Sequence, residues 1–104
     1  AIGARPIDLH LKGFEHLSAE IGMKAGYVVA EASQGLQGAE FNLSGSAGSS
    51  VGATCNVGMA ATLAKGETVI HGAAMEPDVV ELFNFLNKMG AKVEGAGSHT
   101  LRIQ

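Results

Sequence analysis

The stretch PDVVELFNFLNKMGAKVE, residues 77–94, decides the fold of this 104-residue chain. Pro77 suits the first position of a helix, and Gly90 is placed to end it. We predict a helix between them with its apolar face in the core, followed by a closing hairpin of residues 91–94 and 99–103. The apolar face consists of four residues at helical spacing, namely Val79, Phe83, Leu86 and Met89.

The same helix and hairpin occur a second time, nearer the N-terminus. Residues 6–18 predict a helix that begins with Pro6, and residues 21–23 and 27–30 predict two strands around a glycine turn. The two copies align when the chain is shifted by 72 positions, which indicates an internal structural repeat. The shift pairs Ile7 with Val79, Leu11 with Phe83, Phe14 with Leu86 and Leu17 with Met89.

Three further elements lie between the two copies. Residues 39–43 and 67–71 predict strands, and residues 51–65 predict a helix of mostly small residues. Ser50 can cap this helix, and Gly66 is placed to end it. Because crossovers between parallel strands are right-handed, both helices after residue 39 should cover the same face of one sheet.

This order of elements divides the chain unevenly. Residues 39–104 form a complete strand-helix-strand-helix-strand-strand unit, whereas residues 1–38 contain only the last helix and hairpin of a preceding one. The chain also begins without methionine. We therefore expect it to be a piece of a longer protein, with exposed sheet edges and apolar surface where the remainder packs.

Composition narrows the classes of function. Hydrophobic residues make up 46% of the chain and charged residues 16%, which supplies enough apolar material for a packed core. The net charge is -3 without a lysine or arginine cluster, so neither nucleic acid nor a membrane surface is expected as a partner. No apolar run reaches the length of a transmembrane helix. The single Cys55 excludes an internal disulfide, and a reducing cytoplasm is expected.

Two charged residues lie at the start of the first predicted helix. Arg5 precedes Pro6, near backbone N–H groups that carry the positive end of the helix dipole. A guanidinium at this place could bind a phosphate or carboxylate, and the alternative is a solvated arginine beside a helix cap. Asp8 either complements the dipole or holds a hydroxyl or ring N–H of a ligand.

The Gly/Ser-rich loop over residues 45–52 opens a helix and could cradle a phosphate through free N–H groups. It lacks the lysine of a P-loop and the GxGxxG dinucleotide pattern, so a flexible connector is the simpler interpretation. Cys55 is either a nucleophile activated by the helix dipole or a buried small hydrophobe. No pattern calls for a cofactor. No metal site is expected either, because the four histidines lack metal-ligand spacing: His10, His16, His71 and His99.

Six short motifs, in order and at near-correct spacing, are similar to the UDP-N-acetylglucosamine enolpyruvyl transferase family. They span essentially the whole chain and resemble this family more than the sister enzyme of the shikimate pathway. The resemblance implies an α/β fold (α+β in some schemes) of the inverted barrel type, built from the same six-element repeat. The motifs are residues 1–10, 50–54, 59–61, 76–77, 85–91 and 95–97, which read AIGARPIDLH, SVGAT, MAA, EP, FLNKMGA and GAG.

The family resemblance also implies a reaction and a site. Such enzymes transfer the enolpyruvyl group of phosphoenolpyruvate to the 3-hydroxyl of UDP-N-acetylglucosamine and release phosphate. They begin peptidoglycan precursor synthesis in the bacterial cytoplasm and so serve cell-wall growth and division. By resemblance, Arg5 is a catalytic residue in a cationic clamp near phosphoenolpyruvate. The resemblance assigns nucleotide-sugar contacts to Arg5, Pro6, Ile7, Asp8 and Leu9, and a second set that includes the diphosphate to Gly48, Ser49, Ser50, Val51 and Gly52.

Two departures from the family bear on what the chain does alone. The family's catalytic cysteine, which fosfomycin alkylates, immediately precedes the position of Ala1, and Cys55 is not that residue. The loop before Ser50 is expanded over residues 46–49 and lacks a basic residue that some members have. We therefore expect the chain to be inactive without the remainder of the enzyme or a complementary fragment. The alternative is a non-catalytic binding or assembly module that kept the fold.

Overall fold

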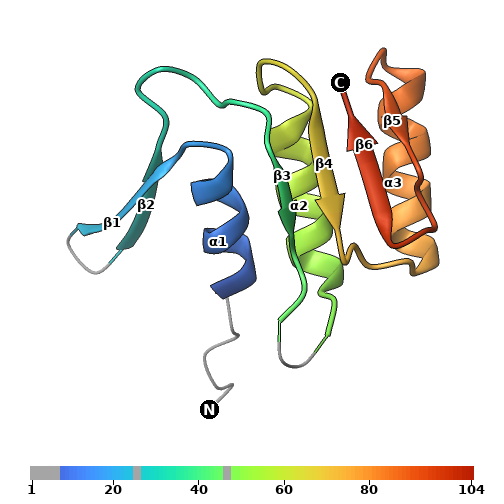
Figure 1. Ribbon diagram of the computed structural model, residues 1–104, viewed down its shortest axis with the longest axis horizontal. Coiled ribbons are helices and arrows are strands. Elements are labelled where there is room, and N and C mark those ends of the chain that lie inside the picture. The colour runs from blue at the N-terminus through green and yellow to red at the C-terminus, as the bar shows by residue number, and fades with distance from the viewer. Residues whose placement is uncertain (1–7, 25–26, 46–47) are drawn as a thin grey trace.

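The computed structural model describes residues 8–24, 27–45 and 48–104, and it confirms the predicted order of elements (Figure 1). The hairpin β1-β2 is antiparallel, and the other strands form a sheet in the order β3-β4-β6-β5. Within the described ranges, no helix is long and apolar enough to cross a membrane. The elements are α1 (Asp8–His16), β1 (Glu20–Lys24), β2 (Tyr27–Glu31), β3 (Glu40–Asn42), α2 (Val51–Ala61), β4 (Thr68–His71), α3 (Pro77–Lys88), β5 (Val93–Glu94) and β6 (Thr100–Ile103).

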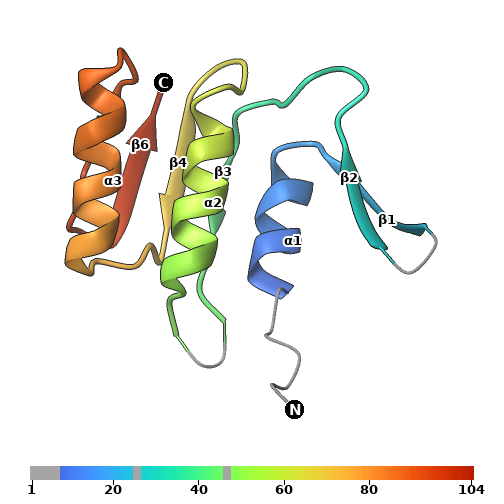
Figure 2. The ribbon, with the colours of Figure 1, turned by 180° about the vertical axis from the view of Figure 1, so that it is seen from behind.

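The four-stranded sheet is mixed. Strand β3 runs parallel to β4, with Phe41 opposite Ile70, and α2 connects the two strands. Strand β6 is antiparallel to both β4 and β5, with Leu101 opposite Ile70 and Ile103 opposite Val93. Both α2 and α3 cover the same face of this sheet, as right-handed crossovers predict (Figures 1 and 2).

The core lies between that sheet and the two helices. Ile70, Leu101 and Ile103 are fully buried. Leu101 and Ile103 alternate with more exposed residues along β6, whereas the first three residues of β4 are all buried. Val57 of α2 and Phe83 of α3 are fully buried as well. One face of the sheet and one face of each helix therefore form the packed interior. This packing sets the position of α2 relative to the strands.

Helix α3 agrees with its predicted bounds at both ends. It begins at Pro77, and Gly90 follows its C-cap with a φ of 106°, a conformation that glycine adopts without strain. The predicted core position of Met89 is wrong, because this side chain is 70% exposed. Met89 is the C-cap, where the chain already leaves the helix, so helical spacing no longer directs its side chain toward the sheet.

Helix α2 ends at Ala61 and not, as predicted, at Lys65. Thr62 is the C-cap, and its hydroxyl donates to the carbonyl of Met59 at 2.6 Å. The N–H of Lys65 donates to the carbonyl of Leu36 at 2.9 Å, so this residue pairs with the segment that precedes β3. A contact between residues far apart in sequence therefore shortens the helix.

Large apolar side chains remain exposed on and just beyond the two helices. Met59 is 38% exposed, Phe85 is 59% exposed, and Leu63 is 82% exposed. Single apolar side chains on a protein surface are common. The apolar surface expected where the remainder of a longer protein packs stays a prediction.

Candidate functional site

The described residues include about half of the predicted site. Arg5, Pro6 and Ile7 lie outside the described residues, as does the side chain of Asp8, so the roles assigned to them stay predictions. Leu9 lies in the first turn of α1, is partly buried and packs against the core. Residues 48–52 are all described, and they form the end of a loop and the beginning of α2.

The described start of α1 lies close to the start of α2, because the two helices pack against each other (Figure 2). A Cβ atom added to Gly45 would lie 3.5 Å from Cδ2 of Leu9. One added to Gly52 would lie 3.3 Å from Nε2 of His10. The beginning of α1 and the beginning of α2, which are distant in sequence, therefore form one continuous surface.

Gly13 permits this close approach of the two helices. A Cβ atom at Gly13 would lie 2.5 Å from Cγ2 of Val57 and 3.0 Å from Cδ1 of Leu43, and both of these side chains are fully buried. Because a packed core does not yield easily, a larger residue at this position would push α1 away from α2. The sequence analysis missed Gly13, since a glycine on the apolar face of a predicted helix carries no periodic signal.

The beginning of α2 offers hydrogen-bond donors to an anion. Ser50 is the N-cap, as predicted, and its Oγ accepts a hydrogen bond from the N–H of Ala53 at 3.1 Å. Its hydroxyl proton remains free to donate to another group. The N–H groups of Val51 and Gly52 precede the first helical hydrogen bond and have no partner among the described residues. These donors lie at the positive end of the helix dipole, which favours negative charge.

The segment after β4 holds the start of α2 in place. Ser49 donates from its hydroxyl to the carbonyl of Gly72 at 2.8 Å, and buried Thr54 accepts from the N–H of Ala74 at 3.0 Å. Gly72 has a φ of 69°, and a Cβ atom there would lie 2.8 Å from Oγ of Ser44. The hydroxyl proton of Ser49 is thus committed to the protein, so this predicted contact residue serves to anchor the loop.

Cys55 lies in α2 as a partly buried residue packed against the core. Burial raises the pKa of the Cys55 thiol, and the negative charge of Asp78 raises it further. A raised pKa leaves the thiol protonated at neutral pH, and the thiolate is the reactive form. The structure therefore supports the interpretation of Cys55 as a small hydrophobe and not as an activated nucleophile.

We expect Cys55 to react with iodoacetamide more slowly than the thiol of glutathione at pH 7, because less of it is thiolate. Since its pKa is raised, the rate should approach that of glutathione only at higher pH. The measurement is the loss of free thiol with time in the folded chain. The same chain in denaturant provides the control and should react at the ordinary rate; faster alkylation of the folded form would contradict the assignment.

Polar pairs on the outer face of the sheet connect neighbouring strands. His71 of β4 contacts Glu40 of β3 at 2.7 Å through Nε2, and Thr100 of β6 at 3.4 Å through Nδ1. Arg102 lies 3.2 Å from a carboxylate oxygen of Glu67. These side chains are largely exposed, and no oxyanion-stabilising group accompanies them in the part of the chain that is described. They are cross-strand pairs that stabilise the sheet.

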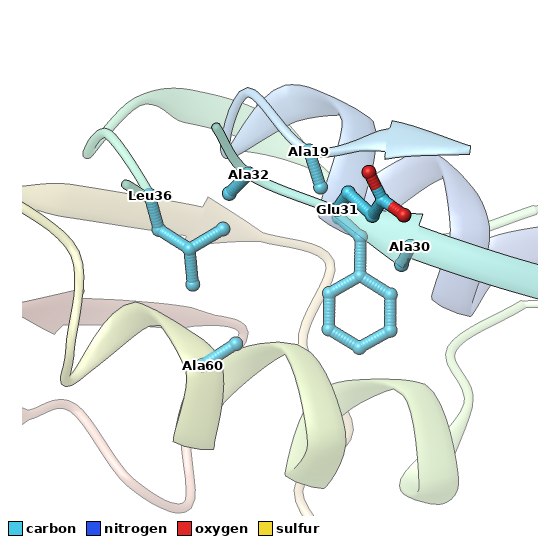
Figure 3. A pocket seen from close by; sticks show the side chains of 7 residues that line it. Ala19, Ala30, Glu31, Ala32, Leu36 and Ala60 are labelled. Carbon is cyan, nitrogen blue, oxygen red and sulfur yellow. The ribbon is translucent and has the colours of Figure 1, made fainter. Parts of the chain in front are cut away.

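An apolar pocket of about 270 Å³ lies between the β1-β2 hairpin, α1 and α2 (Figure 3). Leu36 and Ala60 form one side of it, and the carboxylate of Glu31 points away from them. Apart from Glu31 its lining is apolar and holds neither a nucleophile nor a base. Among the described residues, no group of three or more His, Cys, Asp or Glu side chains is placed to hold a metal ion. The start of α2 is therefore the stronger candidate site.

Comparison with known proteins gives a family match over the whole chain. A sequence model of the EPSP synthase (3-phosphoshikimate 1-carboxyvinyltransferase) family matches residues 1–104. A protein of Trichlorobacter lovleyi is 55% identical over 104 residues, and one of Finegoldia magna is 58% identical over 103 residues. Both bear the name UDP-N-acetylglucosamine 1-carboxyvinyltransferase. The matches cover 100% and 99% of this chain but only 24% of either relative, so the chain spans about a quarter of their length.

Two solved structures share the fold. The enolpyruvyl transferase NikO from Streptomyces tendae superposes with a TM-score of 0.77 at 22% identity, over 97% of this chain and 25% of that one. EPSP synthase from Acinetobacter baumannii gives a TM-score of 0.71 at 21% identity, over 95% of this chain and 22% of that one. The α/β fold that the resemblance implies is therefore confirmed.

Proposed function

Because the chain belongs to the EPSP synthase (3-phosphoshikimate 1-carboxyvinyltransferase) family, we propose that it is part of a UDP-N-acetylglucosamine 1-carboxyvinyltransferase. The names of relatives at 50–58% identity support this acceptor over 3-phosphoshikimate. The full-length enzyme would act in the bacterial cytoplasm, at the start of peptidoglycan precursor synthesis. Residues 39–104 form one complete repeat of it, and residues 1–38 form the end of the preceding repeat.

The proposed reaction joins two anionic substrates. The 3-hydroxyl of the sugar attacks C2 of phosphoenolpyruvate while C3 gains a proton, and loss of phosphate and of a C3 proton then restores the double bond. The site must hold a nucleotide diphosphate and a second phosphate ester together, and this requires fixed donors and cations. The observation that supports the proposal is the close packing of the start of α1 on the start of α2, beside the free N–H groups of Val51 and Gly52. Arg5 supplies the cationic clamp.

The test is an assay of the full-length protein that contains this chain, with UDP-N-acetylglucosamine and phosphoenolpyruvate. We expect release of phosphate and formation of the enolpyruvyl ether, detected by NMR of the product. The control acceptor, 3-phosphoshikimate, should give no product. Binding of the nucleotide sugar without any transfer would instead favour a non-catalytic binding module and would contradict the proposal. The isolated 104-residue chain should be inactive in the same assay.

Replacing Ser50 separates its role as a helix cap from its role toward the ligand. Ser50→Ala should cost about 1 kcal/mol of stability, whereas Ser50→Asp should cost little because aspartate is an equally good cap. The aspartate would nevertheless raise the Kd for UDP-N-acetylglucosamine about tenfold or more, since like charges about 4 Å apart near a protein surface repel by about 4 kcal/mol.

Thermal unfolding and calorimetric titration of the full-length protein measure the two effects. Asn56→Ala is the matched control, since Asn56 lies exposed in the same helix beyond the capping turn. If Ser50→Asp bound the nucleotide sugar as tightly as the wild type, the diphosphate would not lie at the start of α2.

A further inference from the structure

His10 lies in the first turn of α1, with the Nε2 edge of its ring against the first turn of α2. A Cβ atom added to Gly52 would lie 3.3 Å from Nε2 and 3.5 Å from Cε1 of His10. His10 thus lies between the start of α1 and the start of α2. The sequence analysis rejected it as a metal ligand and gave it no other role.

The surroundings of the two ring nitrogens differ. Nδ1 of His10 is buried and has no hydrogen-bond partner among the described residues, whereas Nε2 faces Gly52 in the first turn of α2. A neutral imidazole carries its proton on one nitrogen only. Buried N–H groups without an acceptor are rarer in native structures than buried acceptors without a donor. The tautomer that suits this environment therefore keeps the lone pair on Nδ1 and the proton on Nε2.

That tautomer places one more donor beside those at the start of α2. The N–H groups of Val51 and Gly52 and the hydroxyl proton of Ser50 are already available there. Several hydrogen-bond donors that point to one place suit an anion with several oxygens. A phosphate fits this description better than a hydroxyl or an amide does.

We propose that His10 is a positioning residue that donates its Nε2–H to a phosphate oxygen of the nucleotide sugar. The inference rests on the proposed function and deepens it, because it adds a side-chain donor to a diphosphate site otherwise made of backbone groups and Ser50. In this chain the loop before Ser50 lacks a basic residue, so a donor from α1 takes on part of that task.

Three substitutions in the full-length enzyme distinguish a donor from a space-filling ring. His10→Phe keeps a ring but no donor, His10→Gln places an amide N–H near the position of Nε2, and His10→Asn places one nearer Nδ1. We expect His10→Phe to weaken binding of UDP about tenfold or more, as is typical for a lost hydrogen bond to a charged group. His10→Gln should restore most of the affinity, and His10→Asn should not. Binding of uridine, which has no phosphate, should be unchanged in all three.

NMR of imidazole nitrogens provides a second readout that a structural role would not change. The free enzyme should show the Nε2–H tautomer for His10, and the Nε2–H resonance should shift on addition of UDP but not of uridine. His99→Phe, in the exposed turn between β5 and β6, is the matched control and should bind UDP like the wild type.

Several results would overturn the inference. These are unchanged UDP affinity in His10→Phe, equal losses for UDP and uridine, failure of His10→Gln to restore affinity in a protein that unfolds like the wild type, or an effect on the KM for phosphoenolpyruvate alone. Failure of the proposed function looks different, because the wild-type enzyme would then give no transfer to UDP-N-acetylglucosamine. An active wild type with a neutral His10→Phe variant would reject the role of His10 only.

Discussion

Replacing Phe83 with alanine is expected to destabilise the protein by about 3–5 kcal/mol, the usual cost of removing a buried phenylalanine. Phe83 is completely buried and is the largest fully buried side chain described, between α3 and α2. A Cβ atom at Gly58 would lie only 2.3 Å from Cζ of its ring, so the ring fills the space left by the glycine. The substitution removes this contact and leaves a cavity between the helices.

The measurement is unfolding by urea, read as the change in midpoint at constant slope. Phe85→Ala is the matched control, because Phe85 lies in the same helix and is 59% exposed. It should cost much less than Phe83→Ala, since little packing is lost at an exposed position. Equal losses for the two variants would show that the described packing of α3 on α2 is not the one that stabilises the protein.

Replacing Arg5 with alanine should reduce kcat/KM of the full-length enzyme by about 10²–10³-fold, with little effect on stability. This expectation follows from the proposed function, in which Arg5 stabilises charge during transfer of the enolpyruvyl group. Losing one such donor to a developing charge typically costs this much. Arg5→Lys should recover only part of the activity, because lysine keeps the charge but not the planar pair of donors.

Steady-state kinetics with both substrates tests the role of Arg5. Arg102→Ala is the control, since Arg102 pairs with Glu67 on the outer face of the sheet, away from α1 and α2. It should leave kcat/KM within about twofold, as is usual for an exposed ion pair. Unchanged activity in Arg5→Ala would remove Arg5 from the site.

The sequence predicted those parts of the fold that depend on residues close together along the chain, such as the ends of helices. Pro77 and Gly90 mark the beginning and end of α3, and Ser50 caps α2, because caps depend on residues within a few positions of each other. The end of α2 could not be predicted in this way. Lys65 leaves the helix to pair with Leu36, and no pattern around residue 65 records that partner.

The resemblance proposes the residues of the candidate site, but the sequence does not predict its geometry. Local sequence indicated a capped helix with free N–H groups at Val51 and Gly52, which is a common feature. The distinctive feature is a tertiary contact between two helices. Gly13 allows α1 to approach α2 closely, and His10 lies against Gly52. Such contacts join residues about forty positions apart, and hydrophobic spacing carries no information about them.

The hydrogen bonds that hold the start of α2 to the segment after β4 also bear on the speed of ligand capture. Ser49 and Thr54 are anchored to Gly72 and Ala74 by hydrogen bonds within the chain. A ligand that meets donors already in place loses little free energy in ordering them. Association at this part of the site is then governed by diffusional encounter and charge, and affinity differences among variants of the anchored residues should appear mainly as changes in residence time.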